Sequence, residues 1–324
     1  MPNGKKDNID GTRQMEQLEI ILAQPRGFCA GVKRAIKIVE TALSLYDNQV
    51  WVIHEIVHNT HVIENLSKAG ARFVEDISEV PPGSVTIFSA HGVSTAVEQQ
   101  AAKMGLKTID ATCPLVKKVH HQAQRYAKSG HVVIIIGHHG HPEVEGTLGR
   151  VTGEVHVVSK IQDISNLDVA SPDKLAYVTQ TTLSTDDTRE LIEALKERFP
   201  NIQGPALKDI CYATQSRQDA VRKLSESIDI LLVVGSPNSS NSNRLKETGI
   251  SRGLPAYLVD NAKAIDMKWL KGKKRVGITA GASAPEILVQ DVIKCLCEYF
   301  DVTVKTMEGR EESMRFKQPV FPNF

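Results

Sequence analysis

The sequence predicts an α/β protein made of three similar small α/β domains with parallel sheets that face one shared centre. Three observations lead to this prediction. A cysteine stands at the same place in three look-alike thirds of the chain, after a short apolar run and before a basic, amphipathic stretch. Short β-branched runs are bounded by Gly, Pro, Ser or Asn, and they alternate with helical patterns. Such alternation is typical of parallel strands joined by right-handed helical crossovers.

The three cysteines mark the repeat. Cys29 lies in PRGFCAGVKRA, Cys113 in DATCPLVKKV and Cys211 in DICYATQSRQ, at separations of 84 and 98 residues. The repeat places domain boundaries near residues 112 and 210. The predicted division is a polar N-terminal extension at 1–17, α/β domains at 18–112, 113–210 and 211–305, and a C-terminal tail at 306–324.

Helices are predicted directly after the first two cysteines, over residues 30–46 and 114–129. Pro114 suits the first position of the second helix, and Gly130 can end it. Apolar side chains recur in both segments at helical spacing. In the first segment they are Val32, Ala35, Ile36, Val39, Leu43 and Tyr46, and in the second Leu115, Val116, Val119, Ala123 and Tyr126.

Two strand-like runs, each followed by a polar loop, come after every cysteine. The first runs are VWVIHEIVHN, HVVIIIGHHGHPEVEG and DILLVVGSPNSSNSNR, which place His58, His141 and Ser239 at offsets of 29, 28 and 28 residues. The later runs are VTIFSAHGVS, LAYVTQTTLS and RVGITAGASAPE, which carry His91, Thr181 and Ser283. Ligands of parallel sheets bind beyond the carboxyl ends of the strands, so we expect these loops to line one cavity.

The composition narrows the class of protein. The chain has 324 residues, 41% of them hydrophobic and 24% charged, and a net charge of +1. That balance does not indicate a nucleic-acid or membrane partner, and no apolar run approaches the roughly 20 residues of a membrane span. The N-terminus has no apolar signal core, so we expect a cytoplasmic protein whose five cysteines are reduced.

The chemistry of three equivalent cysteines points to a metal centre with an open position. Three thiolates would hold three corners and leave the fourth free for a ligand. The predicted helix N-termini and nearby Lys and Arg residues favour the ionised thiols. Zinc and an iron–sulfur cluster both accept three thiolates, but a single zinc usually uses compact spacings such as C-x2-C, and this chain has none. Cys295 and Cys297 are interpreted as core residues instead.

The polar residues at the strand ends indicate an anion site. All eleven histidines lie between His54 and His156, and the last third offers serine, asparagine and glycine. Imidazolium, hydroxyl, amide and helix N-terminal N–H groups together could hold two phosphates without a Walker loop. Glu143, in HPEVEGT, could carry a proton at the rim of this pocket, and Thr181 or Thr182 could orient it.

Together these motifs resemble the 4-hydroxy-3-methylbut-2-enyl diphosphate reductase family, the last enzymes of the methylerythritol phosphate route to isoprenoids. The resemblance runs from about Leu18 to about residue 305. The motifs that carry it, in their order, are PRGFCAGVKRAI, IHEIVHN, SAHGVS, DATCPLV, GHHGHPEVEGT, TQTTLS, DICYATQSRQ, SSNSNRL and TAGASAPE.

The resemblance implies a trefoil of three α/β domains around one [4Fe–4S] cluster, with Glu143 and Thr181 as the proton-delivery pair. The implied cluster ligands are Cys29, Cys113 and Cys211. The implied substrate contacts are His58, His91, His141, Thr181, Ser239, Ser240, Asn241 and Ser283. The departures from the family pattern are confined to the N-terminal extension and the C-terminal tail.

The resemblance further implies a two-electron reductive dehydroxylation of (E)-4-hydroxy-3-methylbut-2-enyl diphosphate to isopentenyl and dimethylallyl diphosphate. The substrate hydroxyl would bind the iron that has no cysteine ligand, and ferredoxin or flavodoxin would supply electrons. Two alternatives stay open on the residues alone. One is a zinc-dependent hydrolase that uses the same three cysteines with Glu143 as base, and the other is a non-catalytic regulator that senses an anion or a cluster.

Overall fold

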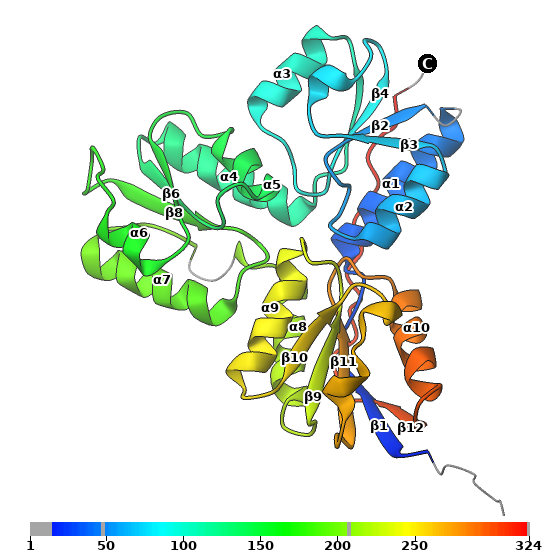
Figure 1. Ribbon diagram of the computed structural model, residues 1–324. Helices are drawn as coiled ribbons and strands as arrows, with labels where there is room; N and C mark the ends of the chain where they lie inside the picture. The colour runs from blue at the N-terminus through cyan, green and yellow to red at the C-terminus, as the bar shows by residue number, and fades with distance from the viewer. Residues whose placement is uncertain (1–14, 47–48, 206–208, 323–324) are drawn as a thin grey trace, which may run out of the picture.

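The computed structural model describes residues 15–46, 49–205 and 209–322. These residues form three lobes around a common centre (Figure 1), and each lobe contains one parallel sheet. The predicted α/β class with three parallel sheets is confirmed. None of the helices in the described ranges has the length and apolar character needed to cross a membrane.

The first lobe holds a four-stranded sheet in the order β3-β2-β4-β5. Its strands are β2 (Val50–Ile53), β3 (Ala71–Val74), β4 (Val85–Phe88) and β5 (Lys107–Asp110). Its helices are α1 (Ala30–Leu45), α2 (Thr60–Lys68), η1 (Ile77–Glu79) and α3 (Thr95–Lys103).

The second lobe holds a three-stranded sheet in the order β7-β6-β8. Its strands are β6 (Val132–Ile136), β7 (Val155–Val158) and β8 (Leu175–Thr179). Its helices are α4 (Pro114–Lys128), α5 (Pro142–Leu148), α6 (Ile161–Ser165) and α7 (Thr185–Arg198).

The third lobe holds a five-stranded sheet in the order β10-β9-β11-β1-β12. Its strands are β1 (Gln17–Leu22), β9 (Ile230–Val234), β10 (Ala256–Val259), β11 (Arg275–Ala280) and β12 (Asp301–Thr306). Its helices are α8 (Tyr212–Leu224), α9 (Ser240–Ser251), η3 (Ala262–Ala264), η4 (Met267–Leu270) and α10 (Glu286–Cys297).

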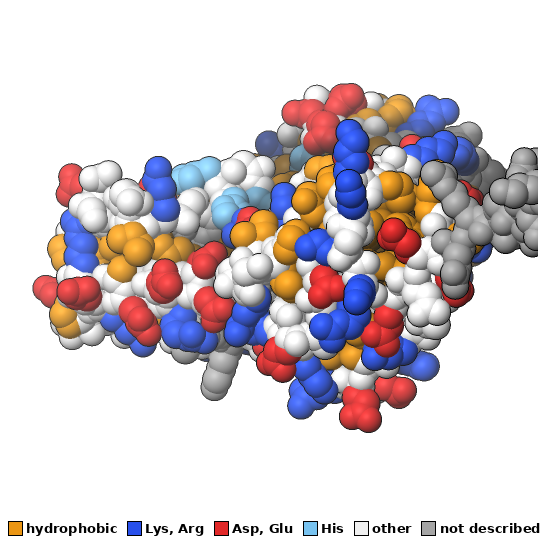
Figure 2. Space-filling model, turned by 60° about the horizontal axis from the view of Figure 1, so that its bottom comes forward, with side chains coloured by type: hydrophobic (Ala, Val, Ile, Leu, Met, Phe, Trp, Pro, Cys, Tyr) orange, Lys and Arg blue, Asp and Glu red, His pale blue; other side chains and the backbone are white. Residues whose placement is uncertain are grey.

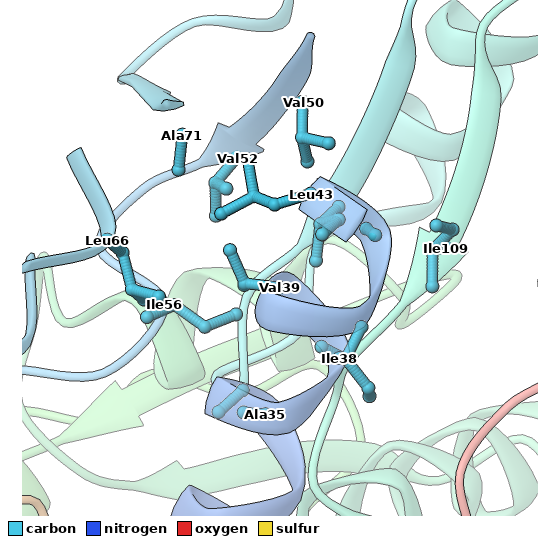
Figure 3. Packing of buried hydrophobic residues seen from close by; sticks show 14 of the residues in the cluster. Ala35, Ile38, Val39, Leu43, Val50, Val52, Ile56, Leu66, Ala71 and Ile109 are labelled. Atoms are coloured by element: carbon cyan, nitrogen blue, oxygen red, sulfur yellow. The ribbon is translucent and has the colours of Figure 1, made fainter. Parts of the chain in front are cut away.

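Each lobe has its own apolar core between sheet and helices. In the first lobe the buried stripe of α1 packs against β2 and β5 (Figure 3), and it includes Ile38, which the predicted stripe omitted. The buried strands β6 and β9 have no exposed residue, as parallel strands covered on both faces require. Truncating a core side chain such as Ile38 to Ala would cost about 2–5 kcal/mol.

The segment before each cysteine belongs to the sheet of the preceding lobe. Strand β1 pairs with β11 and β12 of the third sheet, and β5 lies in the first sheet. Before Cys211, Gln203 bridges to Ala176 of β8 in the second sheet. Each cysteine therefore stands where the chain leaves one lobe and enters the next. The predicted domain boundaries stay predictions, but β1, which falls in the predicted segment 18–112, is part of the third sheet.

The two ends of the chain differ in what the structure describes. Residues 1–14 of the predicted N-terminal extension lie outside the described residues, and Gln17 already begins β1. The tail beyond β12 runs as an extended segment from the third lobe to the first (Figure 1). Along the way Glu312 pairs with Arg217 on α8, and Phe321 packs on the core of the first lobe. The tail thereby ties two lobes together.

Candidate functional site

Loops from all three lobes enclose one pocket with a volume of about 100 Å³. It lies at the carboxyl ends of the strands, where ligands of parallel sheets bind. Space-filling side chains in Figure 2 show charges of both signs spread over the outer face, with histidines near the junction of the lobes. The pocket brings together all twelve predicted site residues: Cys29, His58, His91, Cys113, His141, Glu143, Thr181, Cys211, Ser239, Ser240, Asn241 and Ser283.

The three cysteines occupy equivalent backbone positions. Each is the N-cap residue of a helix, namely α1, α4 and α8. Each also donates its backbone N–H to a carbonyl in the second polar loop of the preceding lobe. These bonds run from Cys29 to Ala282 (3.1 Å), from Cys113 to Ala90 (3.0 Å) and from Cys211 to Thr181 (3.1 Å).

Two of the thiols, those of Cys113 and Cys211, differ from the ionised state that the helix N-termini predict. Burial, together with the neighbouring thiol of Cys29, raises the pKa of Cys113 to about 12 and that of Cys211 to about 11. Desolvation therefore outweighs the N–H groups that approach the sulfurs, such as that of Thr214 at 3.3 Å from Cys211 Sγ. A cationic metal centre would reverse this balance, because it stabilises thiolates directly.

Room for a metal centre is visible beside the sulfurs. A Cβ atom on Gly31, in the first turn of α1, would lie 2.8 Å from Cys113 Sγ and 3.8 Å from Cys29 Sγ. The missing side chain thus leaves space between two thiols that come from different lobes. Within the described ranges, no three His, Cys, Asp or Glu side chains are grouped closely enough to hold one metal ion. A cluster binds each thiolate through a different metal atom, and thiols from three separate lobes suit that arrangement.

Three imidazoles form one side of the pocket. The rings of His58 and His91 stack with centroids 4.1 Å apart, and His141 meets them edge-on at 5.4 and 5.8 Å. His58 Nδ1 lies 3.0 Å from Glu55 Oε2, while its Nε2 is buried and has no hydrogen-bond partner among the described residues. His141 Nδ1 accepts the N–H of Glu143 at 3.1 Å, which leaves its Nε2 to carry the proton.

The imidazoles of His91 and His141 are neutral in the free pocket, in contrast to the imidazolium that we expected from the sequence. Burial lowers the pKa of His141 to about 3, with His58 as the next cause. Burial also holds the pKa of His91 well below its usual range, and the neighbouring His58 and His141 lower it further. A neutral imidazole still donates one N–H to an anion, and a bound anion would raise both pKa values.

The third lobe supplies hydroxyl and amide groups opposite the imidazoles. Ser239 is the N-cap of α9, where its Oγ accepts the N–H of Ser242 at 3.3 Å. Ser283 Oγ lies 3.5 Å from Ser239 Oγ and donates to the carbonyl of His58 at 2.8 Å. Asn241 is buried, and neither polar atom of its amide has a hydrogen-bond partner in the described part of the chain. Buried amides normally have partners, so this one indicates a ligand position.

Glu143 is a buried carboxyl group next to the thiols. Its Oε1 accepts the N–H of Thr181 at 2.6 Å, and its Oε2 accepts the Thr181 hydroxyl at 3.0 Å. Burial raises the pKa of Glu143 to about 7; the bonds from Thr181 oppose the rise, and the charge of Asp209 adds to it. A carboxyl with this pKa is poised to give or take a proton near neutral pH.

Two acidic residues near the site, Glu55 and Asp209, were not predicted from the sequence. Glu55 holds His58 and also accepts a hydrogen bond from Asn238 of the third lobe at 2.8 Å. Asp209 is buried beside Thr179 and faces Lys118 at 3.8 Å. Glu55 stands three residues before a predicted site histidine and Asp209 two before a predicted cysteine, which was the available signal.

The interpretation of Cys295 and Cys297 as core residues is right for the first and wrong for the second. Cys295 packs against the core of the third lobe, but Cys297 is exposed. Two residues along a helix point to nearly opposite sides, so only one of the pair can face the sheet.

The family model and the curated relatives that match this chain all point to one protein family. A family model described as "LytB protein" matches residues 20–297. The 4-hydroxy-3-methylbut-2-enyl diphosphate reductase of Azoarcus sp. (strain BH72) is 56% identical over 305 residues, covering 94% of this chain and 98% of the relative. The protein of the same name from Burkholderia pseudomallei (strain 1026b) is 57% identical over 302 residues, covering 93% and 96%.

Solved structures are similar as well. The E-1-hydroxy-2-methyl-but-2-enyl-4-diphosphate reductase from Plasmodium falciparum matches with a TM-score of 0.87 and 39% identity, covering 94% of this chain and 96% of that one. A structure of (E)-4-hydroxy-3-methyl-but-2-enyl diphosphate reductase matches with a TM-score of 0.62 and 33% identity, covering 87% and 99%.

Proposed function

The chain belongs to the LytB protein family, and from this membership and the pocket geometry we propose that it is a 4-hydroxy-3-methylbut-2-enyl diphosphate reductase. The reaction converts (E)-4-hydroxy-3-methylbut-2-enyl diphosphate to isopentenyl and dimethylallyl diphosphate. It consumes two electrons and two protons and releases water. The observation that carries the proposal is the meeting, in one pocket, of three cysteines, an anion-binding wall and a buried carboxyl whose pKa is about 7.

We propose that Cys29, Cys113 and Cys211 hold one [4Fe–4S] cluster. Their donor set fits, because three soft thiols from three lobes line the pocket, and the space beside Gly31 adjoins two of them, Cys29 and Cys113. When bound, the cluster would supply single electrons and a Lewis-acidic iron for the substrate hydroxyl. Ferredoxin or flavodoxin is the proposed electron donor.

The diphosphate is proposed to lie between the imidazoles and the third lobe. His58 Nε2 and the amide of Asn241 are buried polar groups that lack partners among the described residues, and a bound ligand would satisfy both. Ser239, at the N-terminus of α9, adds a hydroxyl beside the positive end of that helix dipole. The remaining proposed contacts are His91, His141, Thr181, Ser240 and Ser283.

Glu143 is proposed to protonate the departing oxygen. With a pKa of about 7 it is protonated in a large share of molecules at neutral pH. Thr181 fixes the carboxyl through a backbone N–H and a hydroxyl, so one orientation is held before substrate arrives. General acid catalysis of this kind typically contributes about 10²–10⁴-fold to the rate.

Anaerobic purification followed by iron, zinc and sulfide analysis tests the cofactor. The expected result is iron and sulfide in the ratio of one [4Fe–4S] cluster per chain. A reduced electron donor is then supplied with substrate, and both diphosphate products are expected to form. Zinc without sulfide, together with diphosphate turnover that needs no reductant, would replace the proposal by the zinc-hydrolase alternative.

A further inference from the structure

Each helix that begins at a site cysteine carries a basic side chain one to two turns further on. Arg34 follows Cys29 by five residues, Lys118 follows Cys113 by five, and Arg217 follows Cys211 by six. In each case the cationic group stays within its own lobe and reaches the place where the chain leaves that lobe. It contacts the segment that immediately precedes another of the three cysteines. We call these three side chains the braces.

Arg34 is the brace of the segment before Cys113. Its Nη1 donates to the carbonyls of Ala111 and Thr112, both at 3.1 Å. Those two residues connect β5 to Cys113 and carry no charge that could attract a cation. Arg34 is buried, and its Nε donates to the carbonyl of Lys317 in the tail at 2.8 Å.

Arg217 is the brace of the segment before Cys29. Its Nε and Nη2 donate to the carbonyl of Gly27 at 3.1 and 2.7 Å. The side chain is 0% exposed and pairs with both carboxylate oxygens of Glu312, at 2.8 and 2.9 Å. Burying this guanidinium is tolerable only because its donors are satisfied.

Lys118 is the brace of the segment before Cys211. Its Nζ lies 3.8 Å from Asp209 Oδ1. The Asp209 side chain is 0% exposed, whereas that of Lys118 is 54% exposed. This is the weakest of the three contacts, because water competes for the ammonium group.

The three contacts close a ring. The helix of Cys29 braces the segment before Cys113, the helix of Cys113 braces the segment before Cys211, and the helix of Cys211 braces the segment before Cys29. We propose that Arg34, Lys118 and Arg217 are positioning residues that hold each cysteine segment in place for the metal centre. This inference rests on the proposed function, since it deepens the role of the same site.

The ring makes a prediction that a general role in stability does not make. Removing a brace should loosen the cysteine that follows the braced segment, and not the cysteine on the brace's own helix. Loss of Lys118 should therefore affect Cys211, loss of Arg34 should affect Cys113, and loss of Arg217 should affect Cys29. Lysine cannot replace either arginine, because it lacks the planar fork that reaches two acceptors.

Two measurements on the full chain test the ring. The first is the rate at which a chelator removes iron from the anaerobic protein. The second is alkylation of each cysteine by iodoacetamide in metal-free protein, followed by peptide mass spectrometry. For Lys118→Met we expect iron loss and Cys211 alkylation both to be about tenfold faster than in the parent chain, with little change at Cys113. Lys118→Arg, which still reaches Asp209, should restore the parent rates.

The Asp209→Asn variant distinguishes an effect of charge on the reactivity of Cys211 from an effect of the position of that cysteine. If charge alone acted, removing the lysine would slow Cys211 alkylation and removing the carboxylate would speed it. If position acts, both variants speed it. Lys128→Met on the same helix is the matched control, because Lys128 is exposed and lies at the far end of α4. It should leave both rates unchanged.

Arg34→Lys and Arg217→Lys extend the test to the buried braces. Should either arginine variant fail to fold, Lys118→Met still tests the ring, because Lys118 is exposed. Equal acceleration at all three cysteines, acceleration first at Cys113, or no change in Lys118→Met would each overturn the ring. Failure of the parent chain to bind iron and sulfide would instead overturn the proposed function. The alkylation order in metal-free protein still decides the ring in that event.

Discussion

The cysteine side of the pocket and its polar side are built by opposite rules. On the cysteine side the three lobes are alike. Each cysteine is a helix N-cap, and its backbone N–H binds a carbonyl of the preceding lobe. The segment before each cysteine is contacted by a basic side chain from the helix of the preceding cysteine. On the polar side the lobes differ. Two of them contribute imidazoles, and the third contributes hydroxyl and amide groups. Among the described residues that line the pocket, the one carboxyl is that of Glu143 in the second lobe.

The difference shows that the backbone repeats while the side chains diverge. His58, His141 and Ser239 each stand five residues after the end of a strand, at β2, β6 and β9. The positions are equivalent, yet their side chains are two imidazoles and one hydroxyl. A threefold backbone thus gives a metal centre three equal attachment points, and unequal side chains give the substrate a single orientation.

The largest expected effect comes from breaking the cysteine side. Cys29→Ser, Cys113→Ser and Cys211→Ser should each abolish the cluster absorbance and turnover, because a serine hydroxyl is a much poorer ligand for iron than a thiolate. Symmetry predicts that the three variants behave alike. Cys295→Ser on α10 is the matched control and should retain full iron. A cysteine variant that kept full iron and activity would show that its residue is not a ligand.

Glu143→Gln breaks the polar side at its one acidic group. Turnover should fall by about 10²–10⁴-fold, with iron content unchanged. Glutamine fits the site, because its oxygen can accept the Thr181 N–H and its amide can donate to the Thr181 hydroxyl. Steady-state kinetics beside iron analysis separates the two effects. Turnover equal to that of the parent chain would remove Glu143 from the proton path.

The same substitution has a stability signature. The pKa of Glu143 is raised to about 7 in the folded chain, against an ordinary 4.5, so the folded state holds this proton more tightly than the unfolded state. The corresponding stability is present below about pH 4.5 and is lost as pH rises through 7. Between pH 5 and pH 8 the free energy of unfolding of the parent chain should therefore fall by a contribution on the order of 3 kcal/mol from Glu143, and this contribution should be absent in Glu143→Gln. An unchanged pH dependence would contradict the buried carboxyl.

The sequence predicts the threefold symmetry of the backbone better than it predicts the ionisation of the side chains. The spacing of Cys29, Cys113 and Cys211 and the similar loop offsets of 28 to 29 residues were enough to predict three parallel sheets and a shared pocket. The sequence could not show that β1 joins the third sheet, because strand order depends on long-range pairing. It also suggested charged imidazoles and ionised thiols, whereas burial reverses both expectations. Burial is a property of the assembled lobes, which no local motif records.

His91→Ala tests the polar side at lower expected cost. It removes one donor to the diphosphate, so KM should rise by about 10–100-fold while iron content and spectrum stay unchanged. The pKa of His91 lies well below its usual range in the free pocket, and an anion would raise it. Substrate affinity in the parent chain should therefore increase as pH falls, with proton uptake on binding measurable by calorimetry in buffers of different ionisation enthalpy. Loss of iron without a change in KM would place His91 on the cysteine side instead.

Thr181→Val is the smallest and most selective change. Valine keeps the shape and the backbone N–H that binds Glu143 Oε1 at 2.6 Å, and it removes only the hydroxyl at 3.0 Å from Oε2. That hydroxyl lowers the pKa of Glu143, so its loss should raise the pKa further above the ordinary value. A general acid works while protonated, and the alkaline limb of kcat/KM should therefore move to higher pH, with turnover lowered by about tenfold or less.

Thr182→Val is the matched control, because Thr182 donates to Ser240 at 3.1 Å and does not touch the carboxyl. A shift of the limb to lower pH, or an equal shift in both variants, would mean that Thr181 does not set the proton affinity of Glu143.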